Sequence, residues 1–172
     1  LSGLVNDLHL LSQADAGSLS YHCQSVDVAD IIDDVLARLA HEFQQHPLII
    51  DFQPVSASIR GDRARLTQLW LNLAQNTLRY TDAGGQLRIT MHQQHNRLII
   101  CWEDSSPSVP SEDLPRLTER LFRVDDSRQR VNGGSGLGLS IVQAIAQAHN
   151  AELRASLSEL GGLCWTLSFE LE

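Results

Sequence analysis

The segment from Gly133 to Ser140, with the sequence GGSGLGLS, restricts the possible folds of this chain more than any other. Its glycines are closely spaced, and an amphipathic run over residues 141–150 follows at once. Glycine permits backbone turns with positive φ and the close approach of another group. A glycine-rich turn that opens a helix directs N–H groups and the positive end of the helix dipole to one point, which suits a phosphate group. The sequence therefore predicts a phosphate-binding loop that leads into a helix.

Composition limits the partners that such a loop can serve. The chain has 172 residues, which fits one domain, and 42% of them are hydrophobic, which is enough for a core. Its formal net charge of −8 argues against a nucleic-acid or membrane-surface binder. An acidic protein that binds a polyphosphate needs Mg²⁺ and a local basic cluster to offset repulsion. Arg123, Arg128 and Arg130 form such a cluster before the glycines.

Cysteine usage and the absence of long apolar runs bear on the compartment. Cys23, Cys101 and Cys164 are scattered without a C-x-x-C spacing, so we expect reduced structural thiols and an intracellular location. The sequence contains no apolar run of about 18 residues and no recognisable signal peptide. Because the first residue is Leu, we expect a fragment of a longer protein, whose upstream part can include a membrane span.

Hydrophobic periodicity predicts an alternation of helices and strands along the chain. Helices are predicted over residues 1–14, 26–43, 62–80, 111–122 and 141–150, the fourth being short. Strands are predicted over residues 48–52, 55–59, 86–92, 97–102, 151–157 and 163–171. Asp27 and Asp62 are suitable N-caps for the second and third helices. This order predicts an α+β fold in which a helical layer covers one mixed sheet.

One face of the third predicted helix carries polar side chains of a binding type. Asn72, Asn76 and Tyr80 recur every four residues and therefore share a face, which Arg79 borders. An asparagine carbonyl is a suitable oxygen ligand for Mg²⁺, and an arginine can neutralise phosphate oxygens. The pattern alone also fits an ordinary solvated helix face.

Asp104 is the second candidate for ligand recognition. It follows the apolar strand predicted over residues 97–102 and leads into a loop of small residues. A carboxylate in this place can accept a hydrogen bond from the exocyclic amine of adenine. Taken alone, Asp104 also fits an ordinary turn aspartate.

Five segments in order resemble the ATP-binding domain of sensor histidine kinases. They are NLAQNTLRYT at 72–81, the Asp104 loop, LTERLFR at 117–123, GGSGLGLSI at 133–141 and GGLCWTLSFEL at 161–171. The resemblance covers roughly residues 25–172 and places the chain in the superfamily of gyrase, Hsp90, histidine kinases and MutL. It implies a two-layer α/β sandwich, the Bergerat ATP-binding fold, with a five-stranded mixed sheet and three main helices. Residues 1–18 resemble the C-terminal end of the family's dimerisation and histidine-phosphotransfer helix pair.

The resemblance implies a set of nucleotide-binding residues and the cofactors ATP and Mg²⁺. In that pattern Asn76 is the Mg²⁺ ligand, Asp104 contacts adenine, and Thr166 places a hydroxyl near adenine. Arg123 and the residues up to Gly134 form a lid over the nucleotide. The implied set is Asn72, Asn76, Arg79, Tyr80, Asp104, Val109, Arg123, Arg128, Gly134, Ser135, Gly136, Leu137, Gly138, Leu139 and Thr166.

The resemblance also implies a reaction. Superfamily members that hydrolyse ATP have a glutamate general base at the position of Asn72, and an amide cannot act as a base. Phosphotransfer to a histidine is therefore favoured over hydrolysis, with onward transfer to the receiver domain of a response regulator. His41 begins a sequence that only imitates the acceptor motif, so we expect a surface helix residue there and no acceptor histidine in this chain. The implied full-length protein is a homodimer, and this chain its cytoplasmic domain in a bacterial inner-membrane sensor.

Two departures from the family pattern leave two alternatives open. Ser106 and Ser108 stand where the family has glycines, and we expect their side chains to crowd adenine or stiffen the lid. Thr118 and Leu121 stand where aromatic residues are common, which weakens the expected anchor of the lid. The alternatives are a pseudokinase that binds nucleotide poorly and serves as a protein-interaction module, and a hydrolysing ATPase of the same superfamily.

Overall fold

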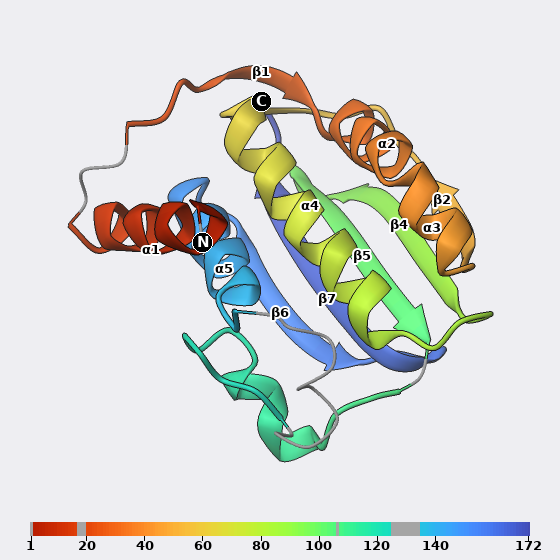
Figure 1. Ribbon diagram of the computed structural model, residues 1–172. Helices are drawn as coiled ribbons and strands as arrows, with labels where there is room; N and C mark the ends of the chain where they lie inside the picture. The colour runs from red at the N-terminus through yellow and green to blue at the C-terminus, as the bar shows by residue number, and fades with distance from the viewer. Residues whose placement is uncertain (1, 17–19, 106, 125–134) are drawn as a thin grey trace.

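The computed structural model describes residues 2–16, 20–105, 107–124 and 135–172. A five-stranded sheet in the order β2-β4-β5-β7-β6 forms its main layer (Figure 1). The strands are β2 (Ile49–Gln53), β4 (Gln86–Gln94), β5 (Arg97–Ser105), β7 (Gly161–Glu170) and β6 (Glu152–Leu157). β2 runs parallel to β4 and the other neighbours are antiparallel. The predicted five-stranded mixed sheet is confirmed.

Three main helices cover one face of this sheet, as predicted (Figure 1). They are α2 (Val28–Arg38), α4 (Arg63–Tyr80) and α5 (Gly138–Ala148). Three shorter or peripheral elements are α1 (Ser2–Asp15), α3 (Ala40–Gln45) and the 3₁₀ helix η1 (Ser111–Arg116). The predicted α+β fold with two layers and an additional N-terminal helix is therefore confirmed.

Strict alternation in β5 builds the core and also determines which way Asp104 points. Leu98, Ile100, Trp102 and Asp104 are all buried, and the residues between them are half-buried. Trp102 stacks on Trp70 of α4, with ring centroids 5.8 Å apart, so this set of side chains faces the helices. Because the period of a strand is two residues, Asp104 continues the apolar series and lies under α4.

The beginning of α4 is fixed by hydrogen bonds from two other segments. Asp62 is the predicted N-cap, and its Oδ1 accepts the Arg65 N–H at 3.1 Å while its Oδ2 accepts the His22 N–H at 2.9 Å. The Asp62 N–H donates to Nε2 of His149, the residue that follows α5, at 3.0 Å. These bonds hold α4 against the end of α5 and determine how the two helices lie side by side.

The region between residues 24 and 61 differs from the prediction in two ways. The helix predicted over 26–43 is divided into α2 and α3 at Leu39, which leaves the helical backbone and keeps both Leu39 and Phe43 buried. The strand predicted over 55–59 lies at 58–61 as β3 (Ser58–Gly61) and pairs with the unpredicted β1 (Gln24–Asp27). β1 and β3 form a two-stranded sheet that is separate from the five-stranded main sheet.

Smaller differences concern edges and ends. The strand predicted over 48–52 is present as β2, and although its residues are mainly apolar, it lies at the edge of the sheet and is mostly exposed. α5 begins at Gly138, inside the glycine segment, and not at residue 141. Asp104 lies within β5 and not after it. The helix predicted near 111–122 is a 3₁₀ helix that ends at Arg116, beside Pro115.

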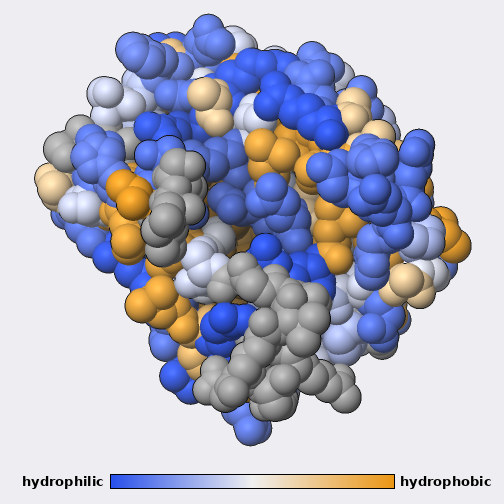
Figure 2. Space-filling view, viewed as in Figure 1, coloured by the Kyte–Doolittle hydropathy of each residue, from blue (hydrophilic) through white to orange (hydrophobic). Residues whose placement is uncertain are grey.

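α1 lies beside α5 at one side of the molecule (Figure 1). Leu10 and Leu11 are buried, whereas Val5 and Leu8 are 61% and 49% exposed. Hydrophilic residues cover most of the helical face in Figure 2, and apolar patches interrupt them. Among the described residues, no helix is both long and apolar enough to cross a membrane.

Candidate nucleotide-binding site

Asp104 is held by hydrogen bonds from two elements. Its Oδ1 accepts the Leu163 N–H of β7 at 2.8 Å, and its Oδ2 accepts the Thr77 hydroxyl of α4 at 3.3 Å. The side chain of Asp104 is only 5% exposed. Burial raises the pKa of this carboxyl to about 6, because the hydrogen bonds from Leu163 and Thr77 only partly offset the loss of water. A carboxylate in such a place can accept a donor from a ligand that reaches the end of β5.

The start of β7 is shaped to admit this carboxylate. The register between β5 and β7 shifts between Glu103 and Ser105, and this irregularity brings the Leu163 N–H to Asp104. A Cβ on Gly162 would collide with Asp104 Oδ1 and with the carbonyl oxygens of Asp104 and Ser105. Residue 162 must therefore be glycine if Asp104 is to keep its position.

The polar face of α4 continues from Asp104 toward the beginning of α5. The Asn72 side-chain N–H donates to the Gln68 carbonyl one turn earlier at 3.0 Å. Its Oδ1 lies 3.4 Å from where a Cβ on Gly138 would be, so Asn72 and the first residue of α5 are in contact. Asn76, one turn further along, is half-buried, and its side chain makes no hydrogen bond with another described residue. Its amide is therefore available to a ligand.

The described part of the glycine segment forms a tight turn against residues 117–122. Gly136 has φ +71°, and its carbonyl accepts the Leu121 N–H at 3.0 Å. Ser135 Oγ accepts the Leu137 N–H at 3.3 Å, and Leu137 is buried. No side chain of a described residue caps the N-terminus of α5, which leaves its first N–H groups free of such a cap. Because Gly138 at this end lies beside Asn72, these N–H groups and the helix dipole lie next to the polar face of α4.

A comparison with family models identifies this arrangement. The model described as "Histidine kinase-, DNA gyrase B-, and HSP90-like ATPase" matches residues 61–172, which contain α4, the whole of β5 and β7, and the glycine turn. The chain belongs to this family.

Relatives of this ATPase family resemble the whole chain. The signal transduction histidine-protein kinase BaeS of Escherichia coli K12 is 40% identical over 173 aligned positions, which cover 100% of this chain and 37% of BaeS. The sensor protein SphS of Synechococcus elongatus is 34% identical over 175 positions, covering 96% of this chain and 42% of SphS. The chain therefore spans about two fifths of the length of these curated relatives.

Solved structures of histidine kinases have the same fold. The Acinetobacter baumannii histidine kinase AdeS superposes with a TM-score of 0.78 at 25% identity, covering 99% of this chain and 78% of that one. Full-length ShkA in complex with AMPPNP superposes with a TM-score of 0.82 at 23% identity, covering 99% of this chain and 36% of that one, and supports the fold alone. The prediction of a histidine kinase ATP-binding domain is confirmed.

The structure brings together part of the predicted nucleotide-binding set. Asp104 lies under α4, Asn72 touches Gly138, and the glycine turn lies at the start of α5. Apart from Thr166 of β7, the remaining described members of the set lie on α4, in the 107–124 segment, or just before and at the start of α5. They are the half-buried Asn76, Tyr80, Val109, Arg123, Gly136, Gly138 and Leu139, the buried Leu137, and the exposed Arg79 and Ser135. Arg128 and Gly134, like Ser106, lie outside the described residues, and the ligand roles of the whole set stay predictions.

Thr166 is not brought to this site. Thr166 pairs with Cys101 across β5 and β7. Its hydroxyl lies 4.0 Å from the Cys101 thiol and 3.8 Å from the Cys164 thiol. The neighbouring Trp165 and Leu167 are the residues of β7 that enter the core under the helices. By strand alternation, the Thr166 side chain faces the opposite side of the sheet from Asp104, so its predicted place near adenine does not agree with the structure.

Sequence reasoning missed Thr77, which contacts Asp104 directly. Its position continues the apolar stripe Leu66, Leu69 and Leu73 at helical spacing, and it is 1% exposed. A threonine in a buried stripe needs a polar partner, so the signal was present in the sequence. His41, in contrast, lies as predicted on the surface of α3, where its Nε2 contacts the Gln45 amide at 3.0 Å.

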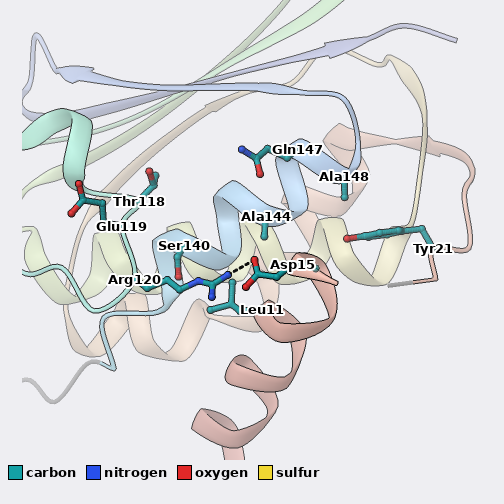
Figure 3. Close-up of a pocket in the computed structure, with 11 residues that line it drawn as sticks. Leu11, Asp15, Tyr21, Thr118, Glu119, Arg120, Ser140, Ala144, Gln147 and Ala148 are labelled. Carbon is teal, nitrogen blue, oxygen red and sulfur yellow. Dashed lines mark hydrogen bonds and ion pairs between the residues drawn. The ribbon is translucent and has the colours of Figure 1, made fainter. Parts of the chain in front are cut away.

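A cavity of about 530 Å³ lies where α1 meets α5 and the turn at residues 118–120 (Figure 3). Residues from α1, from α5 and from the turn after η1 line it, and Tyr21 closes one side. Arg120 of the turn forms an ion pair with Asp15 at the end of α1, with 2.6 Å between Nη2 and Oδ1. This hydrogen bond lowers the pKa of Asp15, and it links α1 to the segment that leads to the glycine turn.

Proposed function

We propose that this chain binds ATP and Mg²⁺ as the catalytic part of a two-component sensor histidine kinase and transfers the γ-phosphoryl group to a histidine outside this sequence. The observation that carries the proposal is the buried carboxylate of Asp104. Its protein partners are a backbone N–H and a hydroxyl. The remaining lone pairs on its oxygens can accept a hydrogen bond from the amino group of adenine.

Asn76 fits the role of metal ligand. Its amide is half-buried on the α4 face that meets the start of α5, and no described residue uses it in a hydrogen bond. Mg²⁺ takes few protein ligands and keeps waters and phosphate oxygens, so a single amide oxygen suits it. When bound, the ion neutralises charge on the phosphate oxygens. The N-terminus of α5 and the backbone of the glycine turn would bind and orient the phosphates of the nucleotide.

The α4 face favours transfer to another nucleophile over attack by water. Gln68, Asn72 and Asn76 follow one another along it at intervals of four residues, and none is a carboxylate. The Asn72 amide is already used by the Gln68 carbonyl, and an amide cannot remove a proton from water. The phosphoryl group is therefore retained for a histidine.

The whole protein extends this proposal beyond the chain. We assign residues 1–18 to the C-terminal end of a dimerisation helix pair and residues 25–172 to the catalytic domain. The acceptor histidine belongs to the helix pair of a homodimer anchored in the bacterial inner membrane, with this domain in the cytoplasm. A BaeR-like response regulator then receives the phosphoryl group on an aspartate of its receiver domain.

The test mixes this chain with a separately supplied dimerisation-helix fragment that carries the acceptor histidine, Mg²⁺ and γ-labelled ATP. Label is expected on the fragment, and Asn76→Ala should abolish it. Gln75→Ala is the matched control, because Gln75 is the exposed neighbour of Asn76 on the same helix. Label that persists with Asn76→Ala would remove Asn76 from the site.

A second candidate function is an interaction module that binds nucleotide poorly. It is favoured by Ser108, whose hydroxyl donates to the Gly162 carbonyl at 3.1 Å and so ties the 107–110 loop to the strand beside Asp104. Titration with a ribose-labelled fluorescent ATP analogue separates the two functions. Saturable, Mg²⁺-dependent binding supports the kinase. Binding that appears only in Ser108→Gly supports the interaction module.

A further inference from the structure

Behind Asp104 lies a chain of hydrogen bonds that no ligand contact requires. Trp102 Nε1 of β5 lies 3.0 Å from Thr77 Oγ1, and this oxygen lies 3.3 Å from Asp104 Oδ2. All three side chains are buried, at 0%, 1% and 5% exposure respectively. They come from two elements, since Thr77 belongs to α4 while Trp102 and Asp104 are alternate residues of β5.

The chemistry of the three groups fixes the direction of the protons. An indole N–H can only donate, so the Thr77 oxygen is the acceptor in the first bond. The hydroxyl has one hydrogen, which is then directed at Asp104 Oδ2. The Leu163 N–H meets the other carboxylate oxygen, so each oxygen receives one donor from the protein. Both donors to Asp104 are uncharged, and neither is ionisable in the working pH range.

The fold does not need this arrangement to accommodate the tryptophan. Two other buried indoles, those of Trp70 and Trp165, have no hydrogen-bond partner for Nε1 among the described residues. Trp70 even stacks on Trp102 in the same core. A buried indole without a partner is thus tolerated here, and the Thr77 contact has to be explained by its other end, at Asp104.

We propose that Thr77, supported by Trp102, is a positioning residue for nucleotide recognition, which keeps the Asp104 carboxylate ionised and in one orientation for the amino group of the base. The inference rests on the proposed function and assigns it a residue outside the set of ligand contacts. A hydroxyl polarised by an indole donor is a stronger donor itself, so the two bonds support one another. Loss of the hydroxyl leaves a buried carboxylate with one donor, which favours its protonated form.

The experiment measures the Kd of a ribose-labelled fluorescent ATP analogue with Mg²⁺, using the full 172-residue chain between pH 5 and 8.5. Thr77→Val keeps the shape and removes the hydroxyl, and should weaken binding roughly tenfold at pH 7. It should also move the midpoint of the acid loss of binding to higher pH. Thr77→Ser should restore both the Kd and the midpoint. Trp102→Phe should act in the same direction as Thr77→Val but less.

Asp104→Asn separates failure of this inference from failure of the proposed function. If Asp104→Asn binds like the wild type, Asp104 does not recognise the base and the proposed recognition of adenine fails. If Asp104→Asn weakens binding while Thr77→Val has the wild-type Kd and midpoint, only the positioning role is overturned. A uniform loss of affinity that Thr77→Ser does not restore also overturns it, because it indicates general damage to packing. Should Thr77→Val fail to fold, Trp102→Phe decides: a midpoint moved to higher pH supports the positioning role, and a wild-type midpoint overturns it.

Discussion

Asp104 and Asp15 show how burial changes what the same side chain does. Asp104 is 5% exposed, its donors are uncharged, and burial raises its pKa to about 6. Asp15 is exposed on α1, its partner is the Arg120 guanidinium, and that hydrogen bond lowers its pKa. The Asp104 carboxylate is held by hydrogen bonds from uncharged donors in a buried place. The Asp15 carboxylate is held by the charge of an arginine at the solvent-exposed surface.

The difference separates a fixed part of the molecule from a part that can be released. The Asp104 network joins α4, β5 and β7, and it changes only if the core moves. The Asp15–Arg120 pair joins α1 to a turn, and solvent and salt screen such exposed pairs. Recognition of the nucleotide and the seating of α1 therefore depend on different physical terms and can be altered separately.

The largest effect is expected from Gly162→Ala. The new Cβ would collide with Asp104 Oδ1 and with backbone carbonyls, so either the strand or the carboxylate must move. A shift of this kind should weaken binding of the fluorescent ATP analogue roughly a hundredfold. The free energy of unfolding should fall by about 2 to 3 kcal/mol, measured by chemical denaturation.

Gly84→Ala is the control for that substitution. Gly84 has φ +81°, but a Cβ there would meet nothing within 4 Å. The variant should lose about 1 kcal/mol of stability through backbone strain and keep the wild-type Kd. Equal losses of affinity in both variants would show that binding follows general stability and not the position of Asp104.

Next in size is the pH dependence that Asp104 gives to the fold. Its pKa rises from 3.8 in the unfolded chain to about 6 in the fold, so the stabilisation by the neutral carboxyl is complete below pH 3.8 and is lost as pH rises through about 6. Asp104→Asn cannot titrate, so the free energy of unfolding of the wild type should fall relative to that of Asp104→Asn by up to about 3 kcal/mol as pH rises from below 3.8 to well above 6. Denaturation of both proteins between pH 4.5 and 8 measures the difference.

Nucleotide binding should show the opposite slope. The ionised carboxylate is the form that accepts the amino group, so the affinity of the wild type should rise as pH increases through about 6. Stability and affinity then change in opposite directions over the same pH range. Parallel slopes would mean that Asp104 does not titrate within the site.

Much of this comparison could be predicted from sequence, but not its decisive contacts. The spacing of polar residues on α4 and the glycine segment predict a nucleotide site. The predicted strand ends at Trp102, two residues before Asp104, and the sequence therefore locates Asp104 close to its true place near the end of β5. The burial of Asp104 does not follow from the strand predicted over 97–102, because β5 continues to Ser105 and its alternation places Asp104 on the buried face. Thr166 was misplaced because a residue's face depends on the register of β7 with β5, which a single sequence does not give.

The remaining differences have the same origin in tertiary pairing. The helix predicted over 26–43 has continuous apolar periodicity, and its break at Leu39 depends on how Leu39 and Phe43 enter the core. β1 is four residues long and is stabilised by its pairing with β3. Local patterns thus predicted the layers, while contacts between distant segments determined the edges and the donors to Asp104.

A smaller effect is expected where α1 packs on the rest of the molecule. Leu11 is 2% exposed, and Leu11→Ala should cost about 2 kcal/mol, the lower end for such changes, because α1 can shift to fill the space. Leu8→Ala, at a position 49% exposed, is the control and should cost little. Limited proteolysis should detect release of α1 in Leu11→Ala, while the Kd for the ATP analogue stays that of the wild type. Weaker binding of the ATP analogue by Leu11→Ala would show that the packing of α1 also affects the nucleotide site.

The smallest effect is expected from the ion pair itself. Arg120→Gln removes the charged partner of Asp15 without removing a buried group, since both side chains are well exposed. Global stability should not change measurably, but α1 should become more sensitive to protease, and added salt should produce the same sensitivity in the wild type. Arg154→Gln is the matched control, because it breaks another exposed ion pair, with Glu152 of β6, in which no residue of α1 takes part. If Arg120→Gln and Arg154→Gln behave alike, the ion pair does not hold α1, and its buried leucines alone account for the contact.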